Sequence, residues 1–289
     1  MKIGLYQLLA AIGGDSAYSA GYADSDSATA TATAGGDWQG ELFGDPAPND
    51  NRFSPPDKAD IAIMSALHTS DGMNLSVLPP HARRLFELSA NAFEAIVHAW
   101  MSELPVTAET IRFGQKILAA ADAAAGGLEA VQQWTAAARR QAADTAATDR
   151  GDADARAVLE AAYKVWHEIH RLMGLLRFSP DEDGVYIARC EPDHLVLPAL
   201  GPHFRERFGQ TPWAIIDEKR SLGMSCSGTL LEFFITGENS AFLENPPDSE
   251  WENMWRHYHK TINNESRNNP DVQRRFMPQR YWKYLTELK

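Results

Sequence analysis

The chain has 289 residues, of which 44% are hydrophobic and 23% are charged, and its formal net charge is −12. This length and composition suit one large folded domain, and the negative charge excludes attraction of the whole surface to a polyanion. No apolar run reaches the roughly 20 residues needed to cross a bilayer, and the two cysteines lack metal-site spacing, so we expect a cytoplasmic protein with reduced thiols.

Residues 1–58 form an acidic leader that we expect to be largely disordered. The first sixty residues carry nine acidic side chains against three basic ones, which accounts for half of the net charge. Residues 16–35 are mainly Ala, Thr, Ser, Asp and Gly, whose burial cannot offset the entropy lost on ordering. Residues 3–12 resemble a short signal peptide, but Tyr18 stands where cleavage after Ala20 would require a small residue.

Residues 59–289 are predicted to form a single α+β domain, whose first part, residues 59–178, is helical. Apolar residues recur there at the spacing of a helix. Prolines, glycines and an Asp-Arg-Gly-Asp sequence separate the helical segments. The predicted helices cover residues 59–68, 79–100, 107–124, 127–147 and 153–176.

The last of these helices has the clearest pattern. Trp166 and Leu172 belong to one broad apolar face, which predicts burial of that face. Glu168 follows Lys164 by four residues, so we expect the two to pair on the solvated face. His170 lies on the border of the apolar face, where we expect a hydrogen-bonded histidine at the edge of the core.

The pattern changes after Pro180, and residues 179–289 are predicted to form strands followed by carboxyl-terminal helices. Short apolar segments bounded by turn residues predict four strands. Helices followed by strands argue for an α+β fold, with a helical amino-terminal half and an antiparallel sheet flanked by helices in the carboxyl-terminal half. The predicted strands cover residues 184–190, 195–200, 213–219 and 229–235.

A final helix is predicted after Ser249, which can form a capping box with Glu252. Between residues 251 and 289 the chain carries eight basic side chains against four acidic ones. Bases interleaved with Trp and Tyr are typical of a surface that contacts phosphates and unpaired bases. Tyr281 and Trp282 leave two interpretations open, because each ring either stacks on a base or anchors a terminal helix in the core. The candidate nucleic-acid contacts are Arg205, Arg207, Arg274, Arg275, Arg280 and Lys283.

Five segments of the carboxyl-terminal half are distinctive: Glu-x-His-Arg at 168–171, GLLRF at 174–178, PDHLVLPALGPHFRERF at 192–208, WAIIDEKR at 213–220 and MPQRYWKYLTE at 277–287. Together they resemble a bacterial family of DNA metabolism proteins, over roughly residues 60–289. Members of that family are found beside a radical-SAM protein of DNA repair or are fused to a uracil-DNA glycosylase-like domain. The resemblance therefore implies a partner of one of these two kinds, and it implies no catalytic residues.

Asp193, Asp217 and Lys219 suggest one specific chemistry. Asp193 follows Pro192 after a predicted strand, while Asp217 and Lys219 are two residues apart on a later strand and so point to the same face. A nuclease of the Pro-Asp…Asp-x-Lys type uses two such carboxylates to hold a divalent metal ion and the lysine to position a water. The alternative interpretation is a turn at Pro192 and an ion-paired strand end, so the sequence does not decide whether the protein is an enzyme.

No sequence motif indicates a bound cofactor. The chain lacks a P-loop, a G-x-G-x-x-G segment and a G-x-S-x-G elbow. His257 and His259 are two residues apart on a predicted helix, so they diverge and cannot chelate one metal ion together. A divalent metal is therefore expected only if the nuclease hypothesis holds.

Three functions are compatible with these patterns. The first is a nucleic-acid-binding accessory protein of a DNA repair or modification system, whose partners are single-stranded or damaged DNA and a radical-SAM or uracil-DNA glycosylase-like protein. The second is a metal-dependent nuclease that uses Asp193, Asp217 and Lys219. The third is a protein-interaction scaffold without catalysis, whose contact surface would be exposed aromatic side chains around Trp251 and Trp255. A membrane partner is not expected in any of them.

Overall fold

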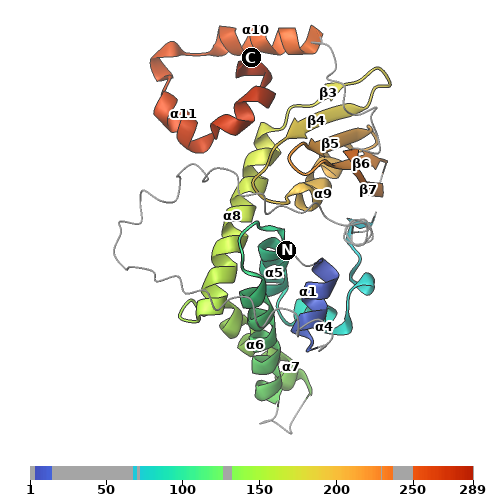
Figure 1. The fold of residues 1–289 in the computed structure, drawn as a ribbon, viewed down its shortest axis with the longest axis vertical. Coiled ribbons are helices and arrows are strands. Elements are labelled where there is room, and N and C mark those ends of the chain that lie inside the picture. Colours follow the sequence, from blue (N-terminus) through green and yellow to red (C-terminus); the bar gives the residue numbers. More distant parts are fainter. Residues whose placement is uncertain are drawn as a thin grey trace.

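The computed structural model describes residues 4–14, 68–69, 72–125, 132–228, 230–236 and 250–288. A helical half lies at one end of the molecule and a five-stranded sheet at the other, and one long helix runs between them (Figure 1). This arrangement confirms the α+β class and the helical amino-terminal half. Within the described ranges, no helix is both long and apolar enough to span a membrane.

Strands β1 (His68–Thr69) and β2 (Gly72–Met73) form an antiparallel pair that lies between α1 and the other helices of the helical half in sequence. The alanine- and threonine-rich part of the leader and residues 59–67 of the predicted helix at 59–68 lie outside the described residues, whereas His68, its predicted last residue, begins β1. The described helices of this half are α1 (Leu5–Ile12), α4 (Pro80–Leu88), α5 (Ala90–Met101), α6 (Thr107–Ala125), α7 (Gln132–Thr148) and α8 (Ala153–Leu175).

Ser89 divides the segment that was predicted as one helix over 79–100. Its backbone is extended, with φ of −153°, so α4 ends there. Its hydroxyl accepts a hydrogen bond from the Ala92 backbone N–H at 3.3 Å, which caps the start of α5. The apolar spacing continues through the break, and for that reason periodicity alone did not reveal it.

Helix α1 is an ordered element within the leader that we expected to be largely disordered. Leu8 and Leu9 are 1% and 0% exposed, because α1 packs against α4, α5 and α6. Ile12 lies so close to Gly114 of α6 that a Cβ atom at position 114 would be 2.7 Å from its side chain. The apolar run of residues 3–12 therefore contributes to the core.

We expect Ile12→Val to lower the free energy of unfolding by about 0.5–1.5 kcal/mol, because it removes one buried methylene group. Ile262→Val is the matched control, since Ile262 is 58% exposed and the same change there should have little effect. Urea denaturation of both variants measures the difference. Equal stabilities for the two variants would contradict the burial of α1.

The sheet has the strand order β3-β4-β5-β6-β7. Three of its pairings are antiparallel, whereas β4 and β5 are parallel, so the sheet is mixed and not purely antiparallel as expected. The parallel pair arises because a helix connects β4 to β5 and returns the chain to the same edge. The strands are β3 (Ser179–Pro180), β4 (Tyr186–Cys190), β5 (Trp213–Asp217), β6 (Leu222–Ser227) and β7 (Leu230–Ile235).

The predicted strand at 195–200 is wrong, because most of these residues begin the connecting helix α9 (Leu197–Phe208). Pro198 lies in its first turn, where the missing N–H group of proline leaves no hydrogen bond unmade. Leu200 is fully buried. A short apolar run of this kind fits a buried strand and a buried helix equally well.

Strand β6 was not predicted, because its sequence, LGMSCS, has no β-branched or aromatic residue. Gly223 in this strand allows the Phe234 ring of β7 to approach so closely that a Cβ atom at 223 would be 2.2 Å from it. The strand is thus specified by packing against its neighbour.

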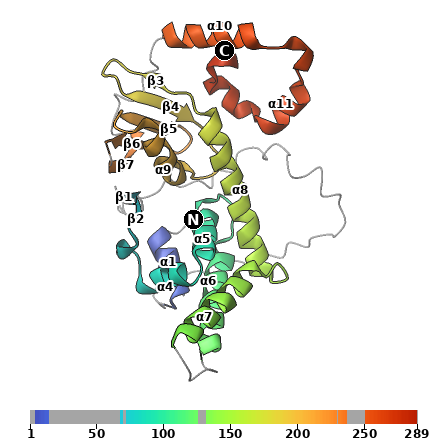
Figure 2. The same ribbon diagram turned by 180° about the vertical axis from the view of Figure 1, so that it is seen from behind.

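Helix α8 connects the two halves, as both ribbon views show (Figures 1 and 2). Asp152 caps its start by accepting from the backbone N–H groups of Asp154 and Ala155, at 2.9 and 3.0 Å. The helix packs against α5 and α6 toward one end and against α9 toward the other. Leu172 is buried as predicted, but Trp166 is 42% exposed, so the buried face is narrower than the sequence suggested.

Residues 250–276 form two helices that leave the body of the molecule, and we call this segment the arm (Figure 2). The chain then returns to the body near the end of α8. Ser249, the predicted capping residue, lies outside the described residues. The described elements are α10 (Glu250–Ile262), a 3-10 turn (Glu265–Arg267), α11 (Pro270–Phe276) and two 3-10 helices, η6 (Gln279–Tyr284) and η7 (Thr286–Leu288).

Candidate functional site

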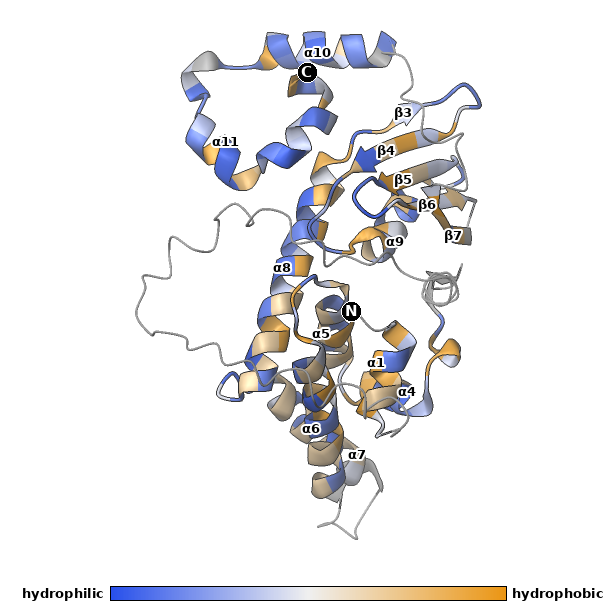
Figure 3. Cartoon of the chain, viewed as in Figure 1, coloured by the Kyte–Doolittle hydropathy of each residue, from blue (hydrophilic) through white to orange (hydrophobic). Residues whose placement is uncertain are grey.

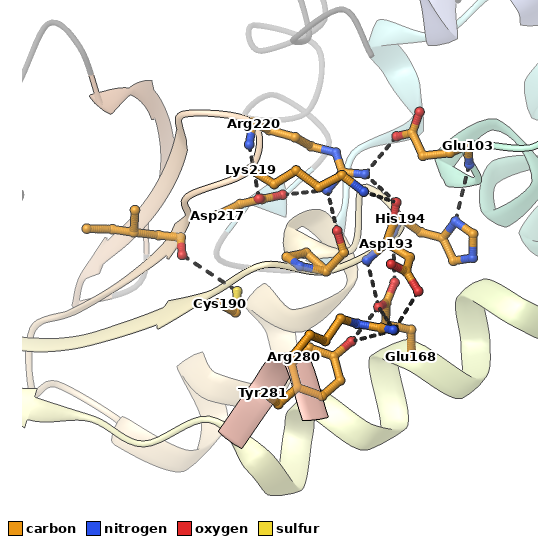
Figure 4. A network of polar contacts seen from close by, with 12 residues as sticks. Glu103, Glu168, Cys190, Asp193, His194, Asp217, Lys219, Arg220, Arg280 and Tyr281 are labelled. Carbon is orange, nitrogen blue, oxygen red and sulfur yellow. Dashed lines mark hydrogen bonds and ion pairs between the residues drawn. The ribbon is translucent and has the colours of Figure 1, made fainter. Parts of the chain in front are cut away.

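The body of the molecule contains a largely buried cluster of charged and polar side chains, which we call the polar network (Figure 4). It combines residues from the turn after α5, from α8, from the loop after β4, from β5 and the turn after it, and from η6. Segments far apart in the sequence are therefore joined at one place. The members are Glu103, Glu168, Asp193, His194, Asp217, Arg220, Arg280 and Tyr281.

Arg220 lies at the centre of the network and is 2% exposed. Its Nη1 donates to the Asp217 carboxylate and to the Pro192 carbonyl, both at 2.9 Å. Its Nη2 donates to the Glu103 carboxylate at 2.8 Å and to the Asp193 carbonyl at 2.6 Å. The planar guanidinium thus holds three turns in fixed positions.

Asp217 ends β5 and is fully buried. Burial raises the pKa of its carboxyl group to about 6, although the charge and hydrogen bonds of Arg220 act in the opposite direction. Its second oxygen, Oδ1, accepts from the backbone N–H of Arg220 at 3.1 Å. Both oxygens are therefore engaged within the turn that follows the strand.

Glu168 projects from α8 into the network and is 2% exposed. Its oxygens accept from the backbone N–H groups of Asp193 and His194, each at 2.8 Å, and from the Tyr281 hydroxyl and the Arg280 guanidinium. Burial alone would raise the pKa of Glu168, but the interaction with the His194 ring and the hydrogen bonds from Tyr281 and the two backbone N–H groups outweigh burial and place the pKa below its ordinary value of 4.5. Glu168 is therefore a carboxylate at neutral pH.

The three nuclease candidates all lie at this network. The Lys219 Nζ donates to the Asp193 carbonyl at 3.5 Å. The Asp193 carboxylate contacts the Arg280 guanidinium at 2.5 Å, and the Asp217 carboxylate contacts Arg220. Among the described residues, no group of three or more His, Cys, Asp or Glu side chains is arranged to hold a metal ion. The metal-dependent nuclease stays a prediction.

Arg280 and Lys283, two of the predicted nucleic-acid contacts, are already paired with acidic side chains. Arg280 contacts the Glu168 carboxylate at 3.2 Å in addition to Asp193. The Lys283 Nζ contacts the Glu191 carboxylate at 2.7 Å. These pairs hold η6 against the body, and Tyr281 between them is 2% exposed, which favours the interpretation of that ring as a core anchor.

The other four candidates lie in two separate places. Arg205 and Arg207 are in the last turn of α9, while Arg274 and Arg275 are in the last turn of α11. Both ribbon views show α9 and α11 apart from each other (Figures 1 and 2). The structure thus does not bring the two arginine pairs together on one surface.

The arm combines exposed rings with basic side chains. Trp255, Tyr258 and Phe276 are 40%, 50% and 66% exposed. Figure 3 shows that hydrophobic and hydrophilic residues are interspersed along α10 and α11. Over the whole arm, residues 250–276, the chain carries five basic side chains against four acidic ones. The five basic residues are Arg256, Lys260, Arg267, Arg274 and Arg275.

The histidines differ from the prediction at one position. His170 is exposed and its ring lies 4.0 Å from that of Trp166, so it is not a hydrogen-bonded residue at the core edge as expected. His194 is 9% exposed, and burial lowers its pKa, so it is neutral at pH 7. Its Nδ1 accepts from the backbone N–H of Glu103 at 3.2 Å. His194 is therefore a structural acceptor in the network.

Sequence reasoning did not identify Glu103, Glu168 or Arg220 as members of a buried polar cluster, although Glu168 and Arg220 belong to the segments that carry the family resemblance. Glu168 was expected to pair with Lys164 on the solvated face, yet it follows the buried Val165 by three residues, a spacing that places both on one face. That spacing was a usable signal. Arg220 contacts Glu103 across 117 positions of sequence, and no local pattern announces such a contact.

Both cysteines are free and buried, as the sequence indicated, and burial raises the pKa of the Cys190 thiol well above its ordinary value.

A family model for a domain of unknown function, DUF4130, matches residues 130–287. The matched region contains the whole arm and every member of the polar network except Glu103. No characterised protein and no solved structure shows significant similarity to the chain.

Proposed function

The chain belongs to the DUF4130 family, and from this premise we propose that it is a cytoplasmic nucleic-acid-binding accessory protein of a DNA repair or modification system. The family description assigns no function. The direction of the proposal comes from the resemblance of the carboxyl-terminal half to DNA metabolism proteins, which implies a radical-SAM or uracil-DNA glycosylase-like partner. The proposed ligand is single-stranded or damaged DNA, and the proposed contact surface is the arm.

One observation carries the proposal: the arm exposes aromatic rings together with five basic side chains, inside a protein of net charge −12. The Trp255 and Tyr258 rings lie 5.7 Å apart and are inclined by 35°. The indole Nε1 of Trp255 donates to Glu287 at 3.1 Å, which orients the ring. Rings of this kind can stack on unpaired bases, which contributes about 1–3 kcal/mol per base.

A protein-interaction scaffold is the second candidate, because the arm also exposes aliphatic side chains. Met254 and Val272 are 56% and 47% exposed. Such side chains contact proteins as readily as they contact bases. Trp255 would serve in either function, and the Trp251 side chain lies outside what the structure describes. Nucleic-acid binding therefore has to be measured directly.

The double variant Arg274→Glu with Arg275→Glu is expected to weaken binding to single-stranded DNA and to reduce its salt dependence. Each phosphate that a base neutralises contributes about 0.7 to the slope of log K against log salt, so two lost contacts lower the slope by about 1.4. Because the whole protein is anionic, attraction beyond the Debye length, about 10 Å at 0.1 M salt, should contribute little. Fluorescence anisotropy with a labelled oligothymidylate at several salt concentrations measures the slope.

Arg140→Glu with Arg150→Glu is the matched control, because both arginines are exposed on the helical half and the change in net charge is the same. This variant should keep the wild-type slope. If both double variants lost DNA affinity and salt dependence equally, the net charge of the protein would control binding and no local site would be needed. Absence of binding by the wild type at low salt, with the fold intact and the partner present, would favour the scaffold.

A further inference from the structure

Helix α8 carries exposed aromatic rings that do not belong to the arm. Tyr163 and Trp166 are 54% and 42% exposed, which makes them the most exposed Tyr, Trp or Phe side chains of the described residues outside the arm. Large exposed apolar groups that lie side by side mark binding surfaces in many proteins. The outer face of α8 therefore contains groups that are suited to contact a partner.

The exposed rings contact one another along two turns of the helix. The ring centroids of Tyr163 and Trp166 lie 6.3 Å apart, and their planes are inclined by only 16°. The His170 ring lies 4.0 Å from that of Trp166, and the His167 ring lies edge-on to that of Tyr163 at 4.3 Å. Mutual contact restricts the rotamers of these side chains, so less entropy is lost when a ligand binds to them. We call Tyr163, Trp166, His167 and His170 the ring face of α8.

Basic side chains flank the ring face on one side. Lys164 and Arg171 are seven residues apart, close to two full turns, so they lie in one row along the helix. Neither forms an ion pair with a side chain that the structure describes. Partial burial lowers the pKa of His167, and the charge of Arg171 lowers it further, so the field at the rings is positive. Glu160 is the one acidic residue among the exposed positions of α8 from 156 to 174, and this surface therefore complements a polyanion.

The ring face borders the place where the arm is attached. Both ribbon views show the arm on the other side of α8 from α9 (Figures 1 and 2). On the circumference of α8, Lys164 and Arg171 lie between the rings and Glu168, because successive residues turn by about 100°. Glu168 in turn contacts Tyr281 of η6, through which the chain returns from the arm. A strand bound to the arm can therefore continue along α8 without crossing the body.

We propose that the ring face of α8 is a second contact for single-stranded nucleic acid. Two bases stack on Tyr163 and Trp166, whose nearly parallel planes suit successive bases. Phosphates pair with Lys164 and Arg171 beside them. The proposal rests on the function proposed for the arm and extends it to a binding surface in two parts. An acidic polypeptide would pair with the cations equally well but would leave the rings without stacking partners.

The test of stacking compares a labelled oligothymidylate with an abasic strand of the same length, which has the same phosphates but no bases. Trp166→Ala should weaken binding of the oligothymidylate by about 5–150-fold, the range for the loss of one stacked base, and should leave binding of the abasic strand unchanged. Tyr6→Ala is the matched control, because it removes a ring of 40% exposure from a helix without charged residues. This variant should bind both strands like the wild type. Fluorescence anisotropy measures the affinities.

The cations of α8 are tested by their effect on salt dependence. Lys164→Gln with Arg171→Gln should reduce the slope of log K against log salt for the oligothymidylate by about 1.4, because two phosphate contacts are lost. Arg140→Gln with Arg150→Gln removes the same charge from exposed positions of the helical half and should keep the wild-type slope. Trp166→Leu removes the ring but keeps an apolar side chain, so it should lose affinity as Trp166→Ala does, with the helices retained in circular dichroism.

The outcomes separate this proposal from the one on which it rests. If Arg274→Glu with Arg275→Glu weakened binding of the oligothymidylate and Trp166→Ala did not, the contact on α8 would be overturned and the arm would remain the binding surface. Equal weakening of both strands by Trp166→Ala would also overturn it, because the ring would then act without stacking. If polyglutamate bound as tightly as the oligothymidylate and lost affinity in Lys164→Gln with Arg171→Gln, the occupant would be an acidic protein segment instead. No binding of the wild type to either strand would contradict both proposals.

Discussion

Arg220→Met is expected to lower the free energy of unfolding by about 3–5 kcal/mol. Methionine is flexible enough to occupy much of the vacated space, so the loss is mainly electrostatic. The buried Asp217 carboxylate and the Glu103 carboxylate would lose the guanidinium that both contact. The carbonyls of Pro192 and Asp193 would lose a donor as well.

The loss of unfolding free energy in Arg220→Met should also depend on pH. Burial raises the pKa of Asp217, and Arg220 opposes that rise, so the variant raises the pKa further. A carboxyl group whose pKa is higher in the folded than in the unfolded chain destabilises the fold increasingly as pH rises. Urea denaturation at acidic and at alkaline pH should therefore show the larger deficit at alkaline pH.

Arg84→Met is the matched control for the ion-pair effect. Arg84 pairs with Asp122, but the two side chains are 41% and 57% exposed, and such pairs contribute about 0–1 kcal/mol. If Arg220→Met were no more destabilising than Arg84→Met, the polar network would not hold the segments together.

Glu168→Gln is expected to have an effect of similar size, about 3–5 kcal/mol at neutral pH. The amide preserves the shape of the side chain, but one acceptor oxygen becomes an NH₂ donor. That donor would face a backbone N–H group of Asp193 or His194, which would then be buried without an acceptor. Arg280 would lose one of its two carboxylate partners.

Acidification should reduce the difference in unfolding free energy between the wild type and Glu168→Gln. The pKa of Glu168 in the folded chain lies below 4.5, so its contribution is complete above the pKa of the unfolded chain and is lost as pH falls through the folded pKa. The difference should be constant near neutral pH and decrease below about pH 4. A difference that is unchanged in acid would contradict the role of the charge.

Tyr281→Phe, which removes a single hydroxyl donor to the Glu168 carboxylate, should lower the free energy of unfolding by about 1.5–3 kcal/mol.

Periodic patterns predicted the helices and strands whose buried side can be recognised from the spacing of apolar residues within the element itself. The face of α8 that includes Leu172 and the cores of β4, β5 and β7 were found in this way, because spacing reports directly which side faces the interior. The run at 195–200 was assigned wrongly because six apolar-rich residues fit either a strand or a helix. The core position of α1 depends on contacts with helices from position 80 onward, which its own sequence does not express.

The candidate site was predicted unevenly for a related reason. Composition alone located the basic character of the arm, including Arg274 and Arg275. It did not show that Arg280 and Lys283 are neutralised, because their acidic partners belong to distant segments. Charge can be counted along a chain, whereas pairing is a property of the folded arrangement.

The two ends of the arm are anchored at neighbouring points on the body. Near the start of α10, Glu252 accepts from the Ser179 hydroxyl at 2.8 Å, and after the arm returns, Glu287 is held by Arg177 and by Trp255. The entropy lost in closing a loop grows only with the logarithm of its length. Lengthening or shortening the chain between α10 and α11 would therefore change the surface that is presented while leaving the body almost as stable as before. The sequence of the arm, and with it the surface that the arm presents, can therefore change without loss of the fold of the body.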